Sequence, residues 1–266
     1  MRALSRLEAV LTSIGDRGPI TLGALTELVD LPKPTVMRLL VTLEESGWVT
    51  KDRSGAYSLG PTLTVLARRY LERDSLATCA LPYMEALRDD IGETISLSVR
   101  TGTTRIYVAE FPSNQPMRFV HELNKREPIH TGASGRLLMA WLDDKTRNTI
   151  YRAGLERLTD VTITDVDEME ATLAETRRQG YAISYGEKSP GALGLAVPLV
   201  DPVTDVLYGL AVFAPLIRYR EEQREEWIRK LRAAADQIIE ARRRETVHGT
   251  AHTGSTSGRR RPASLA

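Results

Sequence analysis

The hydrophobic pattern near the start of the chain predicts two short amphipathic helices joined by a tight turn. Apolar residues recur at helical spacing in the first helix, at Leu22, Leu25, Leu28 and Val29, and in the second, at Val36, Leu39, Leu40 and Leu43. Each apolar stripe is narrow, so each helix keeps an outer face. This is a helix-turn-helix arrangement, in which the second helix fits the major groove of DNA.

A small basic hairpin is predicted directly after the second helix. Residues 48–52 and 56–59 have the composition of strands, and Arg53-Ser54-Gly55 between them is typical of a hairpin loop. Lys51 and Arg53 lie at the tip of this wing, where cations suit contact with phosphates.

The outer face of the second helix carries side chains that suit DNA. Thr35, Arg38 and Thr42 lie opposite the leucines, and an arginine reaches a guanine edge or a phosphate. Pro34 is placed at the first helical position, so Lys33 is expected just outside the helix. The DNA-contacting residues that we predict are Thr21, Lys33, Thr35, Arg38, Thr42, Lys51, Arg53 and Tyr57.

Two other interpretations of this region stay open at this point. It could be an ordinary small helical domain with a surface hairpin, or a winged helix that binds only protein. The basic and hydroxyl side chains that the second helix and the wing tip share favour DNA over both.

The rest of the pattern divides the chain into four parts. A first amphipathic helix precedes the two helices, and Gly60-Pro61 marks the end of a winged helix-turn-helix domain at residues 1–60. A linker helix is expected at 61–75, and a second domain at 76–245. Residues 246–266 are rich in Gly, Ser, Thr and Arg without apolar periodicity, so we expect them to be disordered.

Helices and hairpins are mixed in the second domain. Helices are predicted at 82–91, from Asp165 to Gly180 and at 221–244, and Asp165 with Glu168 gives the second a capping-box-like start. Strands are predicted at 95–99, 106–108, 117–121, 181–185, 195–199 and 206–213. This mixture indicates an α+β fold, with helices against a largely antiparallel sheet.

Composition narrows the functional classes. The count of Lys+Arg is 36 against 35 for Asp+Glu, which argues against nonspecific coating of nucleic acid but permits a local DNA-binding face. The single cysteine, Cys79, forms no internal disulfide, and no stretch is long and apolar enough to cross a membrane. We therefore expect a cytoplasmic protein without a membrane partner.

A segment of small residues suggests a place for an anion. Pro128 to Gly135 precedes an apolar helix predicted at 137–142. Small residues let the backbone approach a ligand, and a helix N-terminus offers free N–H groups and a partial positive charge, which suit a carboxylate. From this segment alone, a tightly packed loop with Ser134 as an ordinary N-cap is an equally good interpretation.

The sequence resembles the IclR family of bacterial transcription regulators over about residues 2–245. The similarity lies in an ordered series of stretches, RALSRLEAVL, LPKPTVMRLLVTLEESGWV, YSLG, GET, IHTGASGRLLMAWL, TITD, RRQGYAIS and the segment from Glu187 to Pro198. Each stretch is weak evidence, but their order and spacing together are specific. Asp30 stands where the family usually has Gly, and Asp tolerates a left-handed turn better than most residues. Pro34 stands where the family has Ser or Thr, and it removes a hydroxyl.

The resemblance implies a GAF-like second domain and a homodimer or dimer of dimers that binds an operator. It also implies a small-molecule pocket beside the small-residue segment. The effector-binding positions that carry over are Gly132, Ala133, Ser134, Ser184, Gly194, Ala211 and Phe213. Three usually polar positions of the family are Ser184, Ala211 and Phe213 in this sequence. This lining favours an effector with a carboxylate and a hydrophobic or aromatic body, rather than a small hydroxy or keto acid.

Two other functional classes are weaker. His130 and Ser134 invite comparison with a hydrolase, yet the residues around Ser134 do not match the G-x-S-x-G elbow. No phosphate-binding glycine loop, zinc spacing or dinucleotide fingerprint appears, so we expect no cofactor and no metal. We predict a ligand-responsive DNA-binding transcription regulator and not an enzyme, with a protein-interaction scaffold as the next interpretation and a hydrolase after it.

Overall fold

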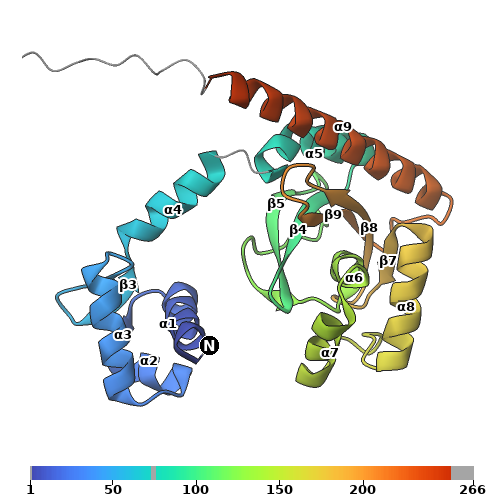
Figure 1. Cartoon of the computed structure of the whole chain (residues 1–266). Helices are drawn as coiled ribbons and strands as arrows, with labels where there is room; N and C mark the ends of the chain where they lie inside the picture. Colours follow the sequence, from blue (N-terminus) through green and yellow to red (C-terminus); the bar gives the residue numbers. More distant parts are fainter. Residues whose placement is uncertain (1, 73–75, 253–266) are drawn as a thin grey trace, which may run out of the picture. The chain divides into compact units, whose positions relative to one another are not determined.

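The computed structural model describes residues 2–72 and 76–252, and the chain divides into two compact units between Ser75 and Leu76 (Figure 1). The N-terminal unit is a winged helix-turn-helix. Its elements are α1 (Arg2–Arg17), β1 (Ile20–Thr21), α2 (Leu22–Val29), α3 (Lys33–Glu45), β2 (Val49–Lys51), β3 (Ala56–Leu59) and α4 (Pro61–Glu72). The predicted helices and hairpin are confirmed. The sequence prediction missed β1, which makes the wing a three-stranded antiparallel sheet in the order β1-β3-β2.

A small apolar core holds the three helices of this unit together. Val10 and Ile14 of α1, Leu25 of α2, and Val36 and Leu40 of α3 are each at most 1% exposed. These residues come from the apolar stripes that the sequence predicted. Their burial leaves the opposite face of α3 free of internal packing.

The turn between α2 and α3 depends on Asp30, whose φ of 47° and ψ of 48° lie in the left-handed region. A short polar side chain tolerates this conformation, so the aspartate serves in place of glycine as predicted. The carbonyl oxygen of Pro32 then accepts the N–H of Thr35 at 2.8 Å. α3 begins at Lys33, so Lys33 lies inside the helix and not before it as predicted. Pro34 sits in the first turn, where its missing N–H loses no hydrogen bond.

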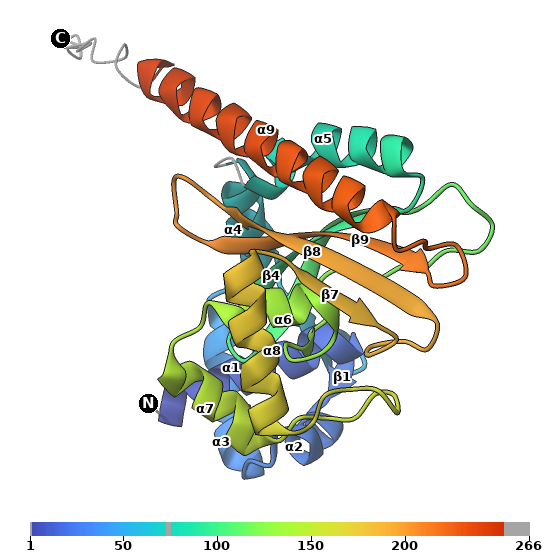
Figure 2. The same ribbon diagram turned by 90° about the vertical axis from the view of Figure 1, so that its right-hand side faces the viewer.

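The C-terminal unit has the predicted α+β fold. Its elements are α5 (Leu76–Ile91), β4 (Thr94–Thr101), β5 (Thr104–Phe111), β6 (Glu127–Pro128), α6 (Gly132–Ala140), α7 (Asp144–Ala153), α8 (Val166–Gln179), β7 (Ala182–Tyr185), β8 (Ala192–Val200), β9 (Leu207–Pro215) and α9 (Gln223–His252). The six strands form one antiparallel sheet in the order β6-β5-β4-β9-β8-β7. Helices α5 and α9 lie side by side on one face, and α6 lies with α8 on the other (Figures 1 and 2).

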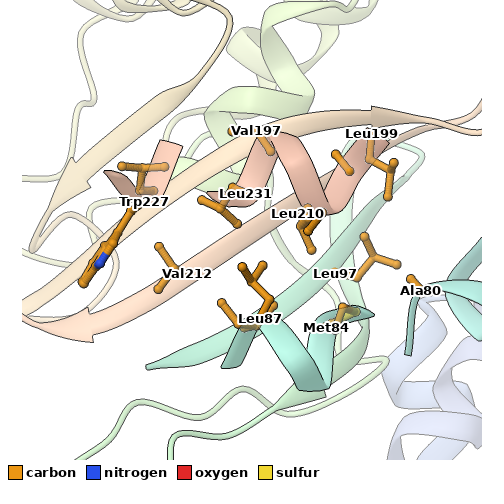
Figure 3. Packing of buried hydrophobic residues seen from close by; sticks show 14 of the residues in the cluster. Ala80, Met84, Leu87, Leu97, Val197, Leu199, Leu210, Val212, Trp227 and Leu231 are labelled. Carbon is orange, nitrogen blue, oxygen red and sulfur yellow. The ribbon is translucent and has the colours of Figure 1, made fainter. Parts of the chain in front are cut away.

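The two faces of the sheet carry different side chains because successive residues of a strand point to opposite sides. Large apolar residues face α5 and α9, where Val197 and Leu210 pack with Leu231 of α9 and Leu87 of α5 (Figure 3). The face toward α6 instead carries the small residues Ser96, Ser98, Gly194, Ala196, Gly209 and Ala211. α6 therefore approaches the sheet closely. A Cβ on Gly209 would lie 3.3 Å from Leu137 of α6.

One predicted strand does not form. Residues 117–121 belong to the loop at 112–126 between β5 and β6, called the cover loop below. Side chains satisfy its backbone groups in place of a neighbouring strand. The hydroxyl of Thr94 donates to the carbonyl oxygen of Phe119 at 2.8 Å, and Arg218 donates to that of Met117 at 2.7 Å.

Three helices extend beyond their predicted ends. α5 begins at Leu76 and includes Pro82, and α6 begins at Gly132 instead of Leu137. α9 reaches His252, inside the segment predicted to be disordered, because elongating an existing helix adds one hydrogen bond for each residue fixed. The rest of that predicted tail lies outside the described residues.

Candidate functional site

The outer face of α3 presents most of the side chains predicted to contact DNA. Lys33, Arg38 and Thr42 are exposed, and Thr35 is half-buried. The hydroxyl of Thr42 donates to the carbonyl oxygen of Arg38 at 3.2 Å and keeps its lone pairs free. The face is therefore basic and hydroxyl-bearing at its centre.

Thr21 lies at the start of α2. Its side-chain oxygen accepts the N–H of Ala24 at 3.4 Å and caps the helix. The residue is exposed at a helix N-terminus, where free N–H groups and a partial positive charge suit a phosphate.

The wing tip is held by Asp52. Its Oδ1 accepts the hydroxyl of Ser54 at 2.7 Å and the N–H groups of Ser54 and Ala56 at 2.8 and 2.9 Å. The hydrogen bond from the Ser54 hydroxyl, followed by that from Ala56, lowers the pKa of the Asp52 carboxyl. Arg53 projects into solvent from this ordered turn.

Tyr57 differs from the other predicted contacts because it is only 4% exposed and packs in the core of the unit. The ammonium group of Lys51 lies 5.3 Å from the centre of its ring. This burial corrects the prediction of a direct contact: the ring supports Lys51 through a cation–π interaction and does not offer a surface to DNA.

The C-terminal unit contains a cavity of about 250 Å³ on the α6 side of the sheet. Its wall comes from β5, the cover loop, β6, the start of α6, the strands β7 to β9 and the turn between β7 and β8. The lining residues are Arg105, Phe119, Val120, His121, Glu122, Lys125, Glu127, Gly132, Ser184, Glu187, Lys188, Ser189, Ala192, Gly194 and Phe213.

The structure brings only some of the predicted effector positions to this wall. Gly132, Ser184, Gly194 and Phe213 line the cavity, whereas Ala133, Ser134 and Ala211 are fully buried outside its lining. The reason is that α6 begins at Gly132, so the next residues turn into the packed interior. The N–H of Ala133 already donates to the hydroxyl of Ser184 at 3.0 Å. The N-cap of α6 is Thr131, so the interpretation of Ser134 as an N-cap is wrong.

One end of the cavity is charged. The carboxylate of Glu127 lies 3.0 Å from Nη2 of Arg105 and 2.7 Å from Nζ of Lys188. Arg105 is fully buried, and its Nε and Nη1 have no hydrogen-bond partner. Burial, followed by repulsion from Arg105, lowers the pKa of Lys188 to about 8. Burial would raise the pKa of Glu127, but Arg105 and Lys188 together bring it below its ordinary value.

Aromatic rings lie next to these cations: Cζ of Arg105 and Nζ of Lys188 are 5.0 and 4.8 Å from the centre of the Tyr107 ring. The ring of His121 stacks on Tyr107 at 4.0 Å between centroids and meets the edge of Phe213 at 4.3 Å. Glu110 accepts the backbone N–H of His121 at 3.1 Å and contacts its Nδ1. Burial nevertheless lowers the pKa of His121. The imidazole is therefore a neutral, flat surface at pH 7.

Glu187 adds an acceptor to the same wall. One of its oxygens lies 3.1 Å from Arg136, and the other, Oε2, is buried without a hydrogen-bond partner. Burial raises the pKa of this carboxyl, although Arg136 opposes the shift. The cavity is thus lined by anionic as well as cationic side chains.

Sequence reasoning missed these charged residues. The three residues, Arg105, Glu127 and Lys188, lie far apart in the chain and belong to no motif. The sequence alone therefore does not show that they come together in the fold. The alternation of β5 was a usable signal, since an arginine among apolar positions that point inward needs a partner.

The geometry does not support a hydrolase pair. Nε2 of His130 meets the carbonyl oxygen of Glu156 at 2.9 Å and not Ser134. Within residues 2–72 and 76–252, no group of His, Cys, Asp and Glu could hold a metal ion. No described helix is long and apolar enough to cross a membrane.

Comparison with known proteins gives the family. Residues 3–53 match the IclR helix-turn-helix domain, and residues 68–240 match the domain described as bacterial transcriptional regulator IclR C-terminal. The chain belongs to the IclR family. It is an IclR-type transcriptional regulator, with a helix-turn-helix DNA-binding domain and a C-terminal effector-binding domain.

Individual relatives of this IclR-family chain support the assignment over nearly its whole length. The HTH-type transcriptional regulator KdgR of Escherichia coli is 30% identical over 86% of this chain and 88% of its own. A crystal structure from Silicibacter sp. TM1040, described as an IclR transcriptional regulator, has a TM-score of 0.82 at 30% identity over 89% of this chain and 94% of its own. An IclR homologue from Microbacterium hydrocarbonoxydans, solved in complex with 4-hydroxybenzoate, has a TM-score of 0.72 at 26% identity. The match covers 90% of this chain and 98% of the homologue.

Proposed function

We propose that this regulator binds an operator as a homo-oligomer and senses a metabolite with a carboxylate and an aromatic or hydrophobic body. The observation that carries the proposal is the cavity in the C-terminal unit, which has a cationic end and an aromatic wall. We assign DNA binding to residues 1–60, linkage to 61–75 and sensing to 76–245. We further propose that the chain acts in the cytoplasm without catalysing a reaction.

The proposed DNA contacts divide by role. Arg38, with Thr35 and Thr42, meets base edges or adjacent backbone in the major groove. The exposed cations Lys33, Lys51 and Arg53 and the capped N-terminus at Thr21 meet phosphates. Phosphate contacts fix the position of the unit on the duplex, and the contacts of α3 provide the sequence preference.

A homo-oligomer is supported by exposed apolar side chains on the helices of the N-terminal unit. Val65 and Leu66 of α4 are 50% and 43% exposed, and Leu4 of α1 is 73% exposed. Burying such side chains between two copies stabilises a dimer. A two-fold dimer then presents two equivalent α3 helices to the half-sites of a near-palindrome.

The ligand class follows from the lining of the cavity, which combines cations with aromatic rings. Lys188 lies 2.7 Å from Glu127 and lines the cavity next to the buried Arg105, so two cations share one carboxylate at this end. A carboxylate that approaches this end gains charge-assisted hydrogen bonds. Phe213 and His121 offer flat apolar surface for a ring, worth about 25 cal/mol per Å² buried. The 4-hydroxybenzoate held by the Microbacterium relative has both features.

Such a ligand would act by its difference in affinity between two arrangements of the oligomer. A metabolite that binds both arrangements equally shifts nothing, however tightly it binds. Binding in the cavity would therefore favour or disfavour the spacing of the two DNA-binding units that matches the operator.

Calorimetric titration tests the ligand class directly. The full chain is titrated with benzoate and 4-hydroxybenzoate, and separately with small polar acids such as pyruvate and glyoxylate. The proposal predicts measurable heats for the aromatic acids and weaker or absent binding of the small ones. Tight binding of only the small polar acids would refute the aromatic part.

A further inference from the structure

The outer face of α3 exposes apolar side chains beside its polar ones. Met37 and Val41 are each 46% exposed and take no part in the core of the N-terminal unit. They lie four positions apart, so they are neighbours on one side of the helix, and Val41 is also three positions from Arg38. Pro34, one turn earlier, is exposed as well. Met37 and Val41 were not among the residues predicted from the sequence to contact DNA.

Scattered exposed apolar residues are ordinary, but the place of this pair is informative. Met37 and Val41 stand between Lys33 at the start of α3 and Thr42, on the same outer face as Arg38. The cations of this face and of the wing suit a polyanion. The apolar pair is thus continuous with the surface proposed to enter the major groove.

A duplex offers one apolar group to such side chains. Thymine alone among the four bases carries a 5-methyl group, and this group lies in the major groove, where apolar side chains contact it. Lysine and arginine side chains contact the phosphates that flank such a base. Glu44 and Glu45 are exposed at the far end of α3, one turn beyond Val41, and their charges disfavour phosphates, so base contact falls to the residues before them.

We propose that Met37 and Val41 read thymine methyl groups next to the base pair contacted by Arg38. The inference rests on the proposed entry of α3 into the major groove and deepens it by naming the bases. It predicts that each half-site of the preferred DNA contains at least one thymine whose methyl group contributes to affinity.

The experiment uses the full chain and DNA duplexes selected by it from a random pool. Each thymine of a selected duplex is replaced singly by uracil, which pairs identically and lacks only the methyl group. Fluorescence anisotropy should show about a fourfold loss of affinity at one or two positions of each half-site, the value for one buried methyl group. Met37→Ser and Val41→Ser should each abolish this sensitivity at its own position.

The control variant is Leu28→Ser, because Leu28 is 47% exposed on α2 and lies outside the proposed contact. It should keep the full discrimination between thymine and uracil. Circular dichroism melting checks that all three variants fold.

The outcomes separate this inference from the proposed function. Salt-sensitive, sequence-preferring binding that ignores every thymine-to-uracil change would leave the proposed function standing and overturn the role of Met37 and Val41. Serine variants that alter the oligomeric state but keep thymine discrimination would also overturn it, because the pair would then be a protein contact. Absence of sequence-preferring DNA binding by the wild type would overturn both.

Discussion

The ammonium group of Lys188 lies 2.7 Å from the carboxylate of Glu127. The same carboxylate meets the fully buried Arg105 at 3.0 Å, so one anion of the chain bridges two cations at the end of the cavity. Nε and Nη1 of Arg105 still have no hydrogen-bond partner. Two cations share one carboxylate at this end of the cavity, so the excess positive charge would favour a ligand carboxylate there.

Carboxylate binding should depend on pH through Lys188. Burial lowers its pKa to about 8, and an anionic ligand favours the protonated form and raises this pKa in the complex. Affinity for benzoate or 4-hydroxybenzoate should thus be full below pH 8 and fall as pH rises above it. Calorimetry between pH 6.5 and 9.5 measures this dependence.

Matched lysine variants separate this effect from general charge. Lys188→Met should weaken binding at pH 7 and remove the fall above pH 8. Lys125→Met should retain the fall, because Lys125 is an exposed lysine of the same wall, paired with Glu122. Equal pH dependence in the wild type and Lys188→Met would show that another group binds the carboxylate.

Glu127→Gln should strengthen carboxylate binding. The substitution keeps the shape of the side chain and removes the internal anion that neutralises Arg105 and Lys188. We expect roughly a tenfold gain in affinity for benzoate, on the order of 1.4 kcal/mol, at a pH below the pKa of Lys188, because the loss of Glu127 lowers this pKa further. A loss of affinity in a variant that melts like the wild type would mean that Glu127 itself helps to bind the ligand.

Arg38→Ala should cost about 1–3 kcal/mol of operator affinity and relax the preference at one base pair. The reason is that Arg38 is exposed on α3 and has no ion-pair partner among the residues that the structure describes. Anisotropy titrations of the selected duplex and of its single base-pair variants measure both effects. Unchanged affinity and preference would mean that α3 is not the recognition helix.

Lys51→Ala and Arg53→Ala should behave differently from Arg38→Ala. Each substitution removes a cation of the wing that contacts phosphate and not a base, so binding should weaken on all DNA sequences. The slope of log Kd against log salt should fall by about 1 for each lost phosphate contact. A change in sequence preference with an unaltered salt slope would place the wing in a groove instead.

Asp165→Ala should destabilise the C-terminal unit by about 1 kcal/mol. The side chain of Asp165 caps α8 by accepting the N–H of Glu168 at 2.9 Å. Urea unfolding measures the loss, with Asp167→Ala as the control, because Asp167 is exposed in the same first turn and is not the cap residue. Equal losses in the two variants would show that helix-dipole charge matters more than the cap.

Local features of the fold were predictable from the sequence because they depend on neighbours in the chain. The cap at Asp165, the left-handed turn at Asp30 and the helix stop at Gly180 are of this kind, and the structure contains all three. The predicted strand at 117–121 failed because Thr94 and Arg218, distant in sequence, satisfy its backbone groups. Tertiary contacts of this type leave no local signal.

The two candidate sites also differ in how far they could be predicted from the sequence. The outer face of α3 follows from helical periodicity, so its polar residues were found, although the exposed Met37 and Val41 were overlooked. The cavity depends on contacts between distant segments. The small residues at Gly132 and Gly194 were recognisable, whereas the joining of Arg105 with Glu127 and Lys188 required the folded sheet.

Ligand-responsive operator binding is tested most directly by measuring DNA binding of the full chain across a range of salt concentrations, with and without 4-hydroxybenzoate or benzoate. We expect log Kd for a selected duplex to rise linearly with log salt, and an aromatic acid that binds the cavity to shift the whole line. A chain that shows no salt-dependent attachment to any selected duplex, with or without these acids, would contradict this expectation.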